Sequence, residues 1–137
     1  MATTVKKVAY FAMDVTNRAG QGAKILGGLA ERGVNLLAFS GFPNGKKAQL
    51  DFIPESAAAF KKAIKAAKLT TRPQKFGFLI QGDDRKGAVA KLLKTLAKKK
   101  INITAIDAAS AGAARYAAIL FVAQKDVTRT ARALKAR

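Results

Sequence analysis

The stretch Asp14-Val-Thr-Asn-Arg-Ala-Gly20 joins an apolar segment to a helical pattern, and it decides the fold. The segment before it, residues 8–13, is apolar throughout, as in a strand that is covered on both faces. After it, apolar residues recur at helical spacing and predict a helix over about residues 20–33, which Gly33 ends. A second strand is predicted from Val34. The stretch is therefore a strand-to-helix junction.

The same junction returns 67 residues further along the chain. Asn17 matches Asp84, Arg18 matches Arg85, and the offset continues without a gap through the predicted helix. Further pairs at this offset are Gly20 and Gly87, Lys24 and Lys91, Leu26 and Leu93, Leu29-Ala30 and Leu96-Ala97, and Val34-Asn35-Leu36 and Ile101-Asn102-Ile103. The chain is a tandem duplication, and we predict units over residues 1–72 and 73–137, each of which would be marginally stable alone.

The first unit continues with a hairpin and a second helix. The hairpin spans residues 34–53, with turn chemistry at Asn44-Gly45. Ser56 precedes the helix, whose apolar stripe faces inward while its lysines lie outside. The stripe consists of Phe60, Ala63, Ile64 and Ala67. The order is β-α-β-β-α, and a last strand must come from residues 69–82.

The second unit repeats this order in fewer residues. Its helix is predicted over residues 87–99, its hairpin over 101–124, and a last helix from a cap at Asp126. Residues 69–82 are short for two strands and a turn, so Pro73 is expected to bend one strand that serves both units. The fold class is therefore α+β: two ferredoxin-like βαββαβ units with helices on one face of an antiparallel sheet, the second lacking its last strand.

Glycines set the first helix apart from the second. Gly22, Gly27 and Gly28 each lower helix propensity by about 1 kcal/mol relative to Ala, and Val89, Lys94 and Thr95 take their places in the second unit. These glycines indicate either a weak helix or a helix that packs closely against a partner helix.

The repeated phrase resembles the ACT domain, a small regulatory module that binds amino acids. The likeness rests on Asn17-Arg-Ala-Gly20, on the Ala- and Leu-rich helix, and on Gly33-Val-Asn-Leu36, and it recurs in the second unit. The usual proline of the phrase is Ala19 here and Lys86 in the second unit. The resemblance implies a ligand between two modules, held by this loop and by residues near Leu36 or Ile103. Asn35 and Asn102 could instead simply begin strands.

The chemistry of the junction suits a zwitterion independently. A glycine lets the backbone approach a ligand closely, and the free N–H groups of a helix start attract a carboxylate. Arg18 or Arg85 could pair with that carboxylate in bidentate fashion, and Asp14, Asn17 or Asp84 could accept hydrogen bonds from an ammonium group. The alternative is that Asn17 and Asp84 only cap helices. The candidate ligand-binding residues are Asp14, Asn17, Arg18, Gly20, Gln21, Leu36, Asp84, Arg85, Gly87 and Ile103.

Composition narrows the classes of function. The sequence has no histidine and no cysteine, so catalysis would fall to eight carboxylates, lysines, tyrosines and hydroxyls, and no cofactor or metal site is predicted. Gly20-Gln-Gly22 is too slight for a dinucleotide fingerprint. No signal peptide or membrane-spanning run is visible, so we expect a cytoplasmic protein with no membrane partner.

The charge raises a second hypothesis. The chain has 26 Lys and Arg against eight Asp and Glu, a formal net charge of +18, which is typical of proteins that bind nucleic acid. The third strand of neither unit has the aromatic phrase of an RNA-recognition motif, and the lysines fall mostly on outer helix faces, as on a solvated surface. We therefore expect weak nucleic-acid binding, and predict a non-enzymatic protein of two ACT-like modules that binds an amino acid or similar metabolite and forms a homodimer.

Overall fold

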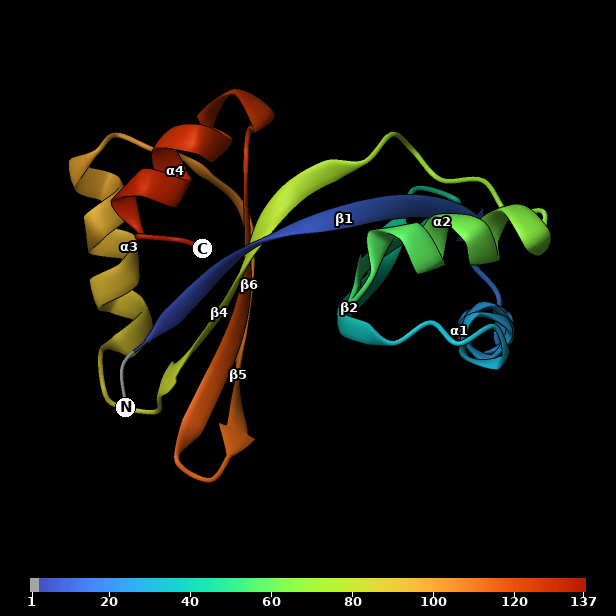
Figure 1. Cartoon of the computed structure of the whole chain (residues 1–137), viewed down its shortest axis with the longest axis horizontal. Helices are drawn as coiled ribbons and strands as arrows, with labels where there is room; N and C mark the ends of the chain where they lie inside the picture. Colours follow the sequence, from blue (N-terminus) through green and yellow to red (C-terminus); the bar gives the residue numbers. More distant parts are fainter. Residues whose placement is uncertain (1–2) are drawn as a thin grey trace. The chain divides into compact units, whose positions relative to one another are not determined.

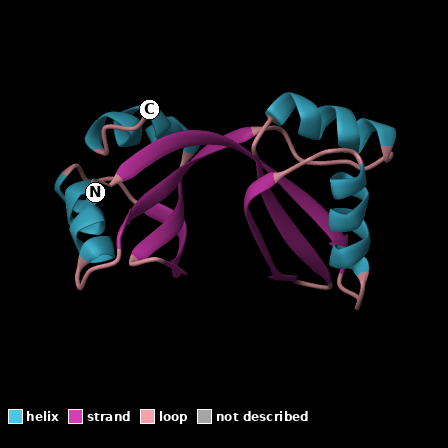
Figure 2. Ribbon diagram, turned by 60° about the horizontal axis from the view of Figure 1, so that its bottom comes forward, coloured by secondary structure: helices cyan, strands magenta, loops and turns pink. Residues whose placement is uncertain are grey.

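The computed structural model describes residues 3–137 and consists of two compact units. Residues 9–75 form one unit, here called the inserted unit. Residues 76–137, together with the stretch that ends at Val8, form the other, here called the split unit because the inserted unit interrupts it in sequence. Both units have two helices on one face of an antiparallel sheet (Figures 1 and 2), which confirms the α+β fold of two ferredoxin-like units.

The inserted unit follows the predicted order of elements. Its elements are β1 (Thr4–Thr16, of which residues 9–16 belong here), α1 (Gln21–Glu31), β2 (Leu36–Asn44), β3 (Lys47–Pro54) and α2 (Ala57–Ala66). The strands lie in the order β2-β3-β1, with Phe11 opposite Phe52 and Phe39 opposite the same residue on the other side. The hairpin turn at Gly45 is as predicted, and Ser56 Oγ accepts a hydrogen bond from Ala59 N–H at 3.1 Å, which caps α2.

The core of the inserted unit is aromatic. The ring of Phe60 from α2 stacks on Phe11 with centroids 4.7 Å apart and lies 5.3 Å from Phe52, and all three side chains are buried. Ile25 and Leu29 close this core from α1. The inner stripe predicted for α2 packs into this core. On α1, Leu26 and Leu29 do so as predicted, together with Ile25, whereas Ala23 and Ala30 of the predicted stripe are exposed.

The split unit has the same design with aliphatic residues. Its elements are β4 (Lys75–Asp83), α3 (Ala88–Lys98), β5 (Ile103–Gly112), β6 (Arg115–Val122), a short 3-10 turn (Gln124–Asp126) and α4 (Val127–Ala133). Leu92 and Leu96 of α3 pack with Ile80 and Leu120 of the sheet, and Val127 packs from α4. The strand order is β1-β4-β6-β5, that of a ferredoxin-like sheet.

The fourth strand of the split unit comes from the start of the chain. This unit has no last strand of its own, as expected, and the first half of β1 fills the place beside β4. Thr3 lies against Gly82 and the Lys7 ammonium lies 4.6 Å from the ring centroid of Phe76, so the two strands run antiparallel. Arg137 bonds to the other side of β1, its N–H donating to Val5 C=O at 3.0 Å.

Two local expectations were wrong. Residues 69–74 form no strand that Pro73 bends; this segment lies beside β1 through a single backbone bond from Arg72 N–H to Ala12 C=O at 2.9 Å. Asp126 stands before α4, but its side chain does not cap the helix, because the carboxylate pairs with Arg129 at 3.1 Å instead.

Candidate functional site

The repeated junction has the same backbone geometry in both units. Gly20 precedes α1 with φ 85° and Gly87 precedes α3 with φ 79°, a left-handed conformation that glycine adopts without strain. A turn closes each loop: Gln21 N–H donates to Arg18 C=O at 3.2 Å, and Ala88 N–H donates to Arg85 C=O at 3.1 Å. The duplication seen in the sequence is therefore a duplication of this loop structure.

Neither loop uses a side chain to cap its helix. α1 and α3 both begin without a side-chain capping bond, so Asn17 and Asp84 do not have the purely structural role of N-caps. Both side chains are exposed, and they stand beside the start of a helix, where the positive end of the helix dipole lies. The loop positions thus keep polar groups available for a ligand.

The loop of the split unit borders a hollow of about 380 Å³. Asp84 and Arg85 lie on one side of it and Ser110 of β5 lies on another, with Tyr116 of β6 also lining it. Burial raises the pKa of Tyr116, and the Arg115 charge opposes this shift. The hollow is therefore lined by a carboxylate, a guanidinium, a hydroxyl and a phenol that stays protonated at neutral pH.

The two arginines of the loops differ in their partners. Arg85 lies 3.2 Å from Asp83, which also binds Arg115 at 2.8 Å, yet its side chain remains 75% exposed. Arg18 is exposed, and nothing in residues 3–137 forms an ion pair with it. Both guanidiniums can therefore turn toward a ligand, and Arg18 does so without breaking an ion pair.

Asp14 is already engaged within the inserted unit. Arg72 holds both its carboxylate oxygens, with Nη2 to Oδ1 at 2.6 Å and Nε to Oδ2 at 3.2 Å. The hydrogen bond from Asp14 raises the pKa of Arg72, and this outweighs the opposing effect of desolvation. An ammonium group at Asp14 would have to share the carboxylate with Arg72, a partner that lies 58 residues away in sequence and that no local pattern indicated.

Leu36 and Ile103 lie away from the loops of their own units. Each stands at the start of its strand, and each is partly buried against the core of its unit. Because β1 and β2 both pair with β3 in antiparallel fashion, Thr16 and Asn44 share one end of the sheet, whereas Leu36 is at the other. Within one unit these residues are not brought together with the junction loop.

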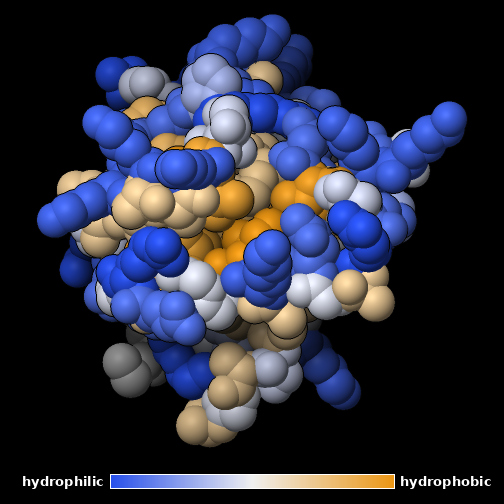
Figure 3. Space-filling view, turned by 90° about the vertical axis from the view of Figure 1, so that its right-hand side faces the viewer, coloured by the Kyte–Doolittle hydropathy of each residue, from blue (hydrophilic) through white to orange (hydrophobic). Residues whose placement is uncertain are grey.

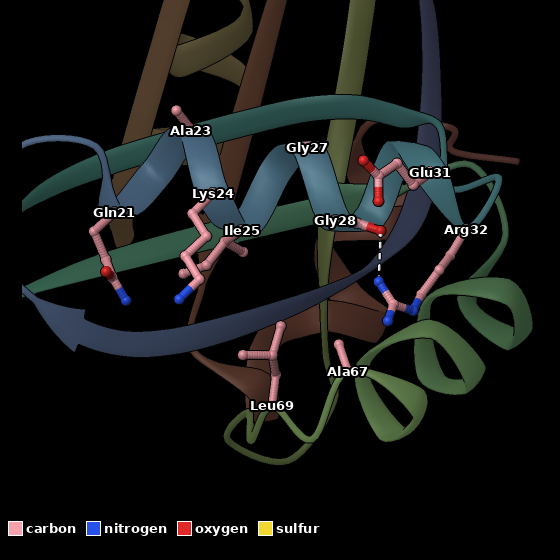
Figure 4. Close-up of a pocket in the computed structure, with 10 residues that line it drawn as sticks. All are labelled: Gln21, Ala23, Lys24, Ile25, Gly27, Gly28, Glu31, Arg32, Ala67 and Leu69. Atoms are coloured by element: carbon pink, nitrogen blue, oxygen red, sulfur yellow. Dashed lines mark hydrogen bonds between the residues drawn. The ribbon is translucent and has the colours of Figure 1, made fainter.

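A second hollow separates the two helices of the inserted unit. It has a volume of about 610 Å³, and Ile25 and Leu69 provide its apolar surface (Figure 4). Figure 3, which views the side where α1 and α2 lie, shows apolar surface in a hollow framed by hydrophilic side chains. Gln21, one of the candidate ligand-binding residues, lines this groove between the helices.

The glycines of α1 leave this groove open. A side-chain carbon added at Gly22 or Gly27 would meet no atom of residues 3–137 within 4 Å. Within residues 3–137 no helix packs closely against Gly22 or Gly27, so close packing against a partner helix would require a helix outside the described residues. In the split unit the corresponding groove between α3 and α4 is about 240 Å³.

Residues 3–137 were compared with the requirements of a metal cluster and of a membrane-spanning helix. Among residues 3–137 no cluster of three or more potential ligands (His, Cys, Asp or Glu) could hold a metal ion. In the same range no helix is long and apolar enough to cross a membrane.

Comparison with solved structures places the whole chain in one structural class. It resembles a protein from Bacteroides thetaiotaomicron with a TM-score of 0.77 and 20% identity, over 97% of this chain and 88% of that one. It also resembles the regulatory subunits of aspartate kinase from Thermus thermophilus (TM-score 0.67, 17% identity) and Thermus flavus (TM-score 0.63, 16% identity), in each case over 98% of this chain and 95% of the other. At these identities the likeness shows the fold.

Comparison with family models found a match in the split unit. No curated protein sequence matches the chain. The ACT domain model matches residues 78–137, which include the second copy of the loop and both helices of this unit. The resemblance that the repeated phrase indicated is confirmed, and it supports a small-molecule-binding regulatory role. Residues 78–137 therefore match the ACT domain, in a chain whose two units share the ferredoxin-like fold.

Proposed function

We propose that this chain is a non-catalytic regulatory protein that binds an amino acid or a similar small metabolite, and that it acts in the cytoplasm. The observation that carries the proposal is the hollow beside Asp84 and Arg85, next to a left-handed glycine at a helix start, in an ACT domain. Its volume of about 380 Å³ is within the range of small-molecule sites.

The groups around this hollow complement a zwitterion. A ligand carboxylate would accept bidentate hydrogen bonds from the Arg85 guanidinium, while Asp84 would accept hydrogen bonds from its ammonium group. Ser110 and Tyr116 add neutral donors at the wall. In the inserted unit, Arg18 could likewise bind the ligand carboxylate and Asn17 could accept a hydrogen bond from its ammonium group. The sequence contains no histidine or cysteine to serve as a general base or nucleophile, which favours binding without catalysis.

The test is a thermal-shift screen of the twenty amino acids, followed by calorimetry on each hit, since a ligand of the native state raises the melting temperature. Replacing Arg18 or Arg85 by Ala should weaken binding by about 1.5–3 kcal/mol, because each removes a hydrogen bond between charged groups. Arg32→Ala is the matched control, with the same charge change at an exposed helix end outside the loop. Unchanged affinity in both loop variants would sink the site assignment.

We also propose that the chain forms a homodimer. The missing strand cannot support this proposal, because β1 fills its place. The edge strand β2 supports it instead: Leu37, Phe39 and Phe42 are 37–44% exposed, and residues 34–45 contain no charged side chain to discourage pairing. Light scattering at micromolar concentration, with and without amino acids, should give twice the chain mass. A monomer under both conditions would refute the dimer.

A further inference from the structure

Helix α3 carries a straight line of lysines. Lys91, Lys94 and Lys98 follow one another at intervals of three and four residues, so they share one face of the helix. At 1.5 Å rise per residue they are spaced about 4.5 and 6 Å apart along its axis. All three are exposed, and Lys99 and Lys100 continue the charge beyond the end of the helix.

These lysines are not neutralised by acids of this unit. Neither α3 nor α4 contains an acidic residue, and no lysine in residues 3–137 lies in an ion pair with a side-chain carboxylate. The carboxylates that precede α3 are Asp83, which binds Arg85 and Arg115, and Asp84. The line of lysines (Lys91, Lys94, Lys98) therefore presents its full charge to solvent.

Cations from α4 extend this surface. Lys135 lines the same hollow as Lys91, so the two ammonium groups flank one groove. Arg129 donates to the carbonyl oxygens of Lys99 and Lys100 at 3.0 and 3.4 Å, which fixes a guanidinium at the end of α3. The split unit thus concentrates positive charge from both helices on its helical side.

The fold does not require these lysines. In the inserted unit α1 occupies the same place and buries the same inner positions, but it has Gly27 and Glu31 where α3 has Lys94 and Lys98. A helix at this position in the fold can therefore carry one lysine, as α1 does, or three, as α3 does on the same face. The extra charge on α3 is a property of its surface and calls for a partner of opposite charge.

The kind of polyanion that this surface would bind is indicated by the lack of exposed large apolar side chains on α3 and α4. The exposed large apolar side chains in residues 3–137 are Leu37, Phe39, Phe42 and Phe76, and none lies on α3 or α4. A helix that binds a membrane surface needs an apolar face to insert, and a protein interface needs an apolar or aromatic anchor. Single-stranded nucleic acid needs aromatic side chains on which bases stack. A regular row of phosphates needs only cations.

We propose that the line of lysines on α3, together with Lys99, Lys100 and Lys135, is a docking surface for the phosphate backbone of a double-stranded nucleic acid. Lysines are point charges that neutralise phosphates and release counterions, which makes binding strongly dependent on salt. Lysine can contact guanine in the major groove, but the planar Arg, Asn and Gln groups that read base edges in fixed bidentate geometry are absent from the lysine line. Binding is therefore indifferent to base sequence.

The test compares two variants of equal charge in the full chain. The triple variant Lys91→Gln, Lys94→Gln, Lys98→Gln removes the line on α3, and the triple variant Lys61→Gln, Lys62→Gln, Lys65→Gln removes three exposed lysines from α2. Binding of a 20-base-pair DNA duplex is followed by fluorescence anisotropy between about 50 and 200 mM salt. Circular dichroism melts establish that both variants fold, as expected for exposed positions.

The α3 variant should bind at least about tenfold more weakly at 50 mM salt, and the slope of log K against log salt should fall by about 2.7, for three lost contacts at about 0.9 each. The α2 variant should keep the slope of the unaltered protein. Equal losses in both variants would overturn the proposal, since only the net charge would then matter. Tighter binding to single strands or to anionic phosphatidylserine vesicles than to duplex would also overturn it. Amino-acid binding should be unchanged in the α3 variant, which separates this surface from the proposed ligand site.

Discussion

Helices α1 and α3 hold the same position in two copies of one unit, and their outer faces have diverged in character although both keep one matching lysine, Lys24 and Lys91. Their inner faces agree: Ile25 and Leu29 are buried in one unit, as Leu92 and Leu96 are in the other. Outside, α1 has glycines along a groove of about 610 Å³, whereas α3 has lysines beside a groove of about 240 Å³. Packing constrains one face of a duplicated helix, and the other face is left for function to change.

The cores show a second difference between the units. Phe60 stacks in an aromatic cluster in the inserted unit, and Val127 stands at the equivalent position in the split unit. Aromatic side chains bury more area than aliphatic ones, so stability in the inserted unit is concentrated in fewer residues.

The largest expected effect on stability tests the difference between the two cores. Phe60→Ala should lower the free energy of unfolding by about 3–5 kcal/mol, because it leaves a cavity beneath α2. Val127→Ala removes two buried methyl-group equivalents and should cost about 2 kcal/mol. Urea denaturation followed by circular dichroism measures both values. Equal losses would mean that the aromatic cluster adds nothing beyond ordinary burial.

A smaller effect on stability is expected from substitutions at equivalent positions of α1 and α3. Gly27→Ala should stabilise the chain by about 1 kcal/mol, because the glycine is inside a helix and an added methyl group meets no neighbour. Lys94→Gly, at the equivalent position of α3, should destabilise it by about the same amount. Thermal melts of the two variants should shift in opposite directions. A destabilising Gly27→Ala would show that the glycine has a packing partner, such as a second copy of the chain.

The smallest effect concerns the tyrosines, of which each unit has one. Burial, assisted by the charge of Asp51, raises the pKa of Tyr10, and burial raises that of Tyr116. The folded state therefore favours the protonated phenols, so stability present below about pH 10 should be lost as the pH rises through the raised values. Tyr116→Phe should flatten this loss relative to the unaltered protein. Unfolding free energies at pH 8 and 11 test it, and identical pH dependence in the variant would contradict the shift.

Local features of the fold could be predicted from the sequence. The junction at Gly20, its copy at Gly87 and the inner stripe at Phe60 depend on neighbouring residues, so periodicity and glycine placement indicated them. The division of β1 between two units could not be predicted, because a pairing between residues 3–8 and 76–83 leaves no local signal. The strand expected around Arg72 was wrong for a related reason: the segment makes only one backbone bond to β1, from Arg72 N–H to Ala12 C=O.

The candidate site could be predicted in part. The loop residues Asn17, Arg18, Asp84 and Arg85 follow from the repeat, and whether they bind a ligand stays a prediction. The partners that surround them come from distant strands and loops: Arg72 on Asp14, Arg115 on Asp83, and Ser110 at the hollow. An arginine or a serine in an otherwise ordinary strand gives no sign of which carboxylate or cavity it will meet.

The division of β1 also has a consequence for how the protein is made. During synthesis, residues 4–8 leave the ribosome well before the strand they pair with, β4, which begins at Lys75. The inserted unit can close as soon as residue 75 is available, while the split unit must wait for its helices and then pair with a strand made before the inserted unit. Such long-range pairing is slow. The first half of β1 therefore stays without its partner while the whole inserted unit is made, so the inserted unit is expected to fold before the split unit.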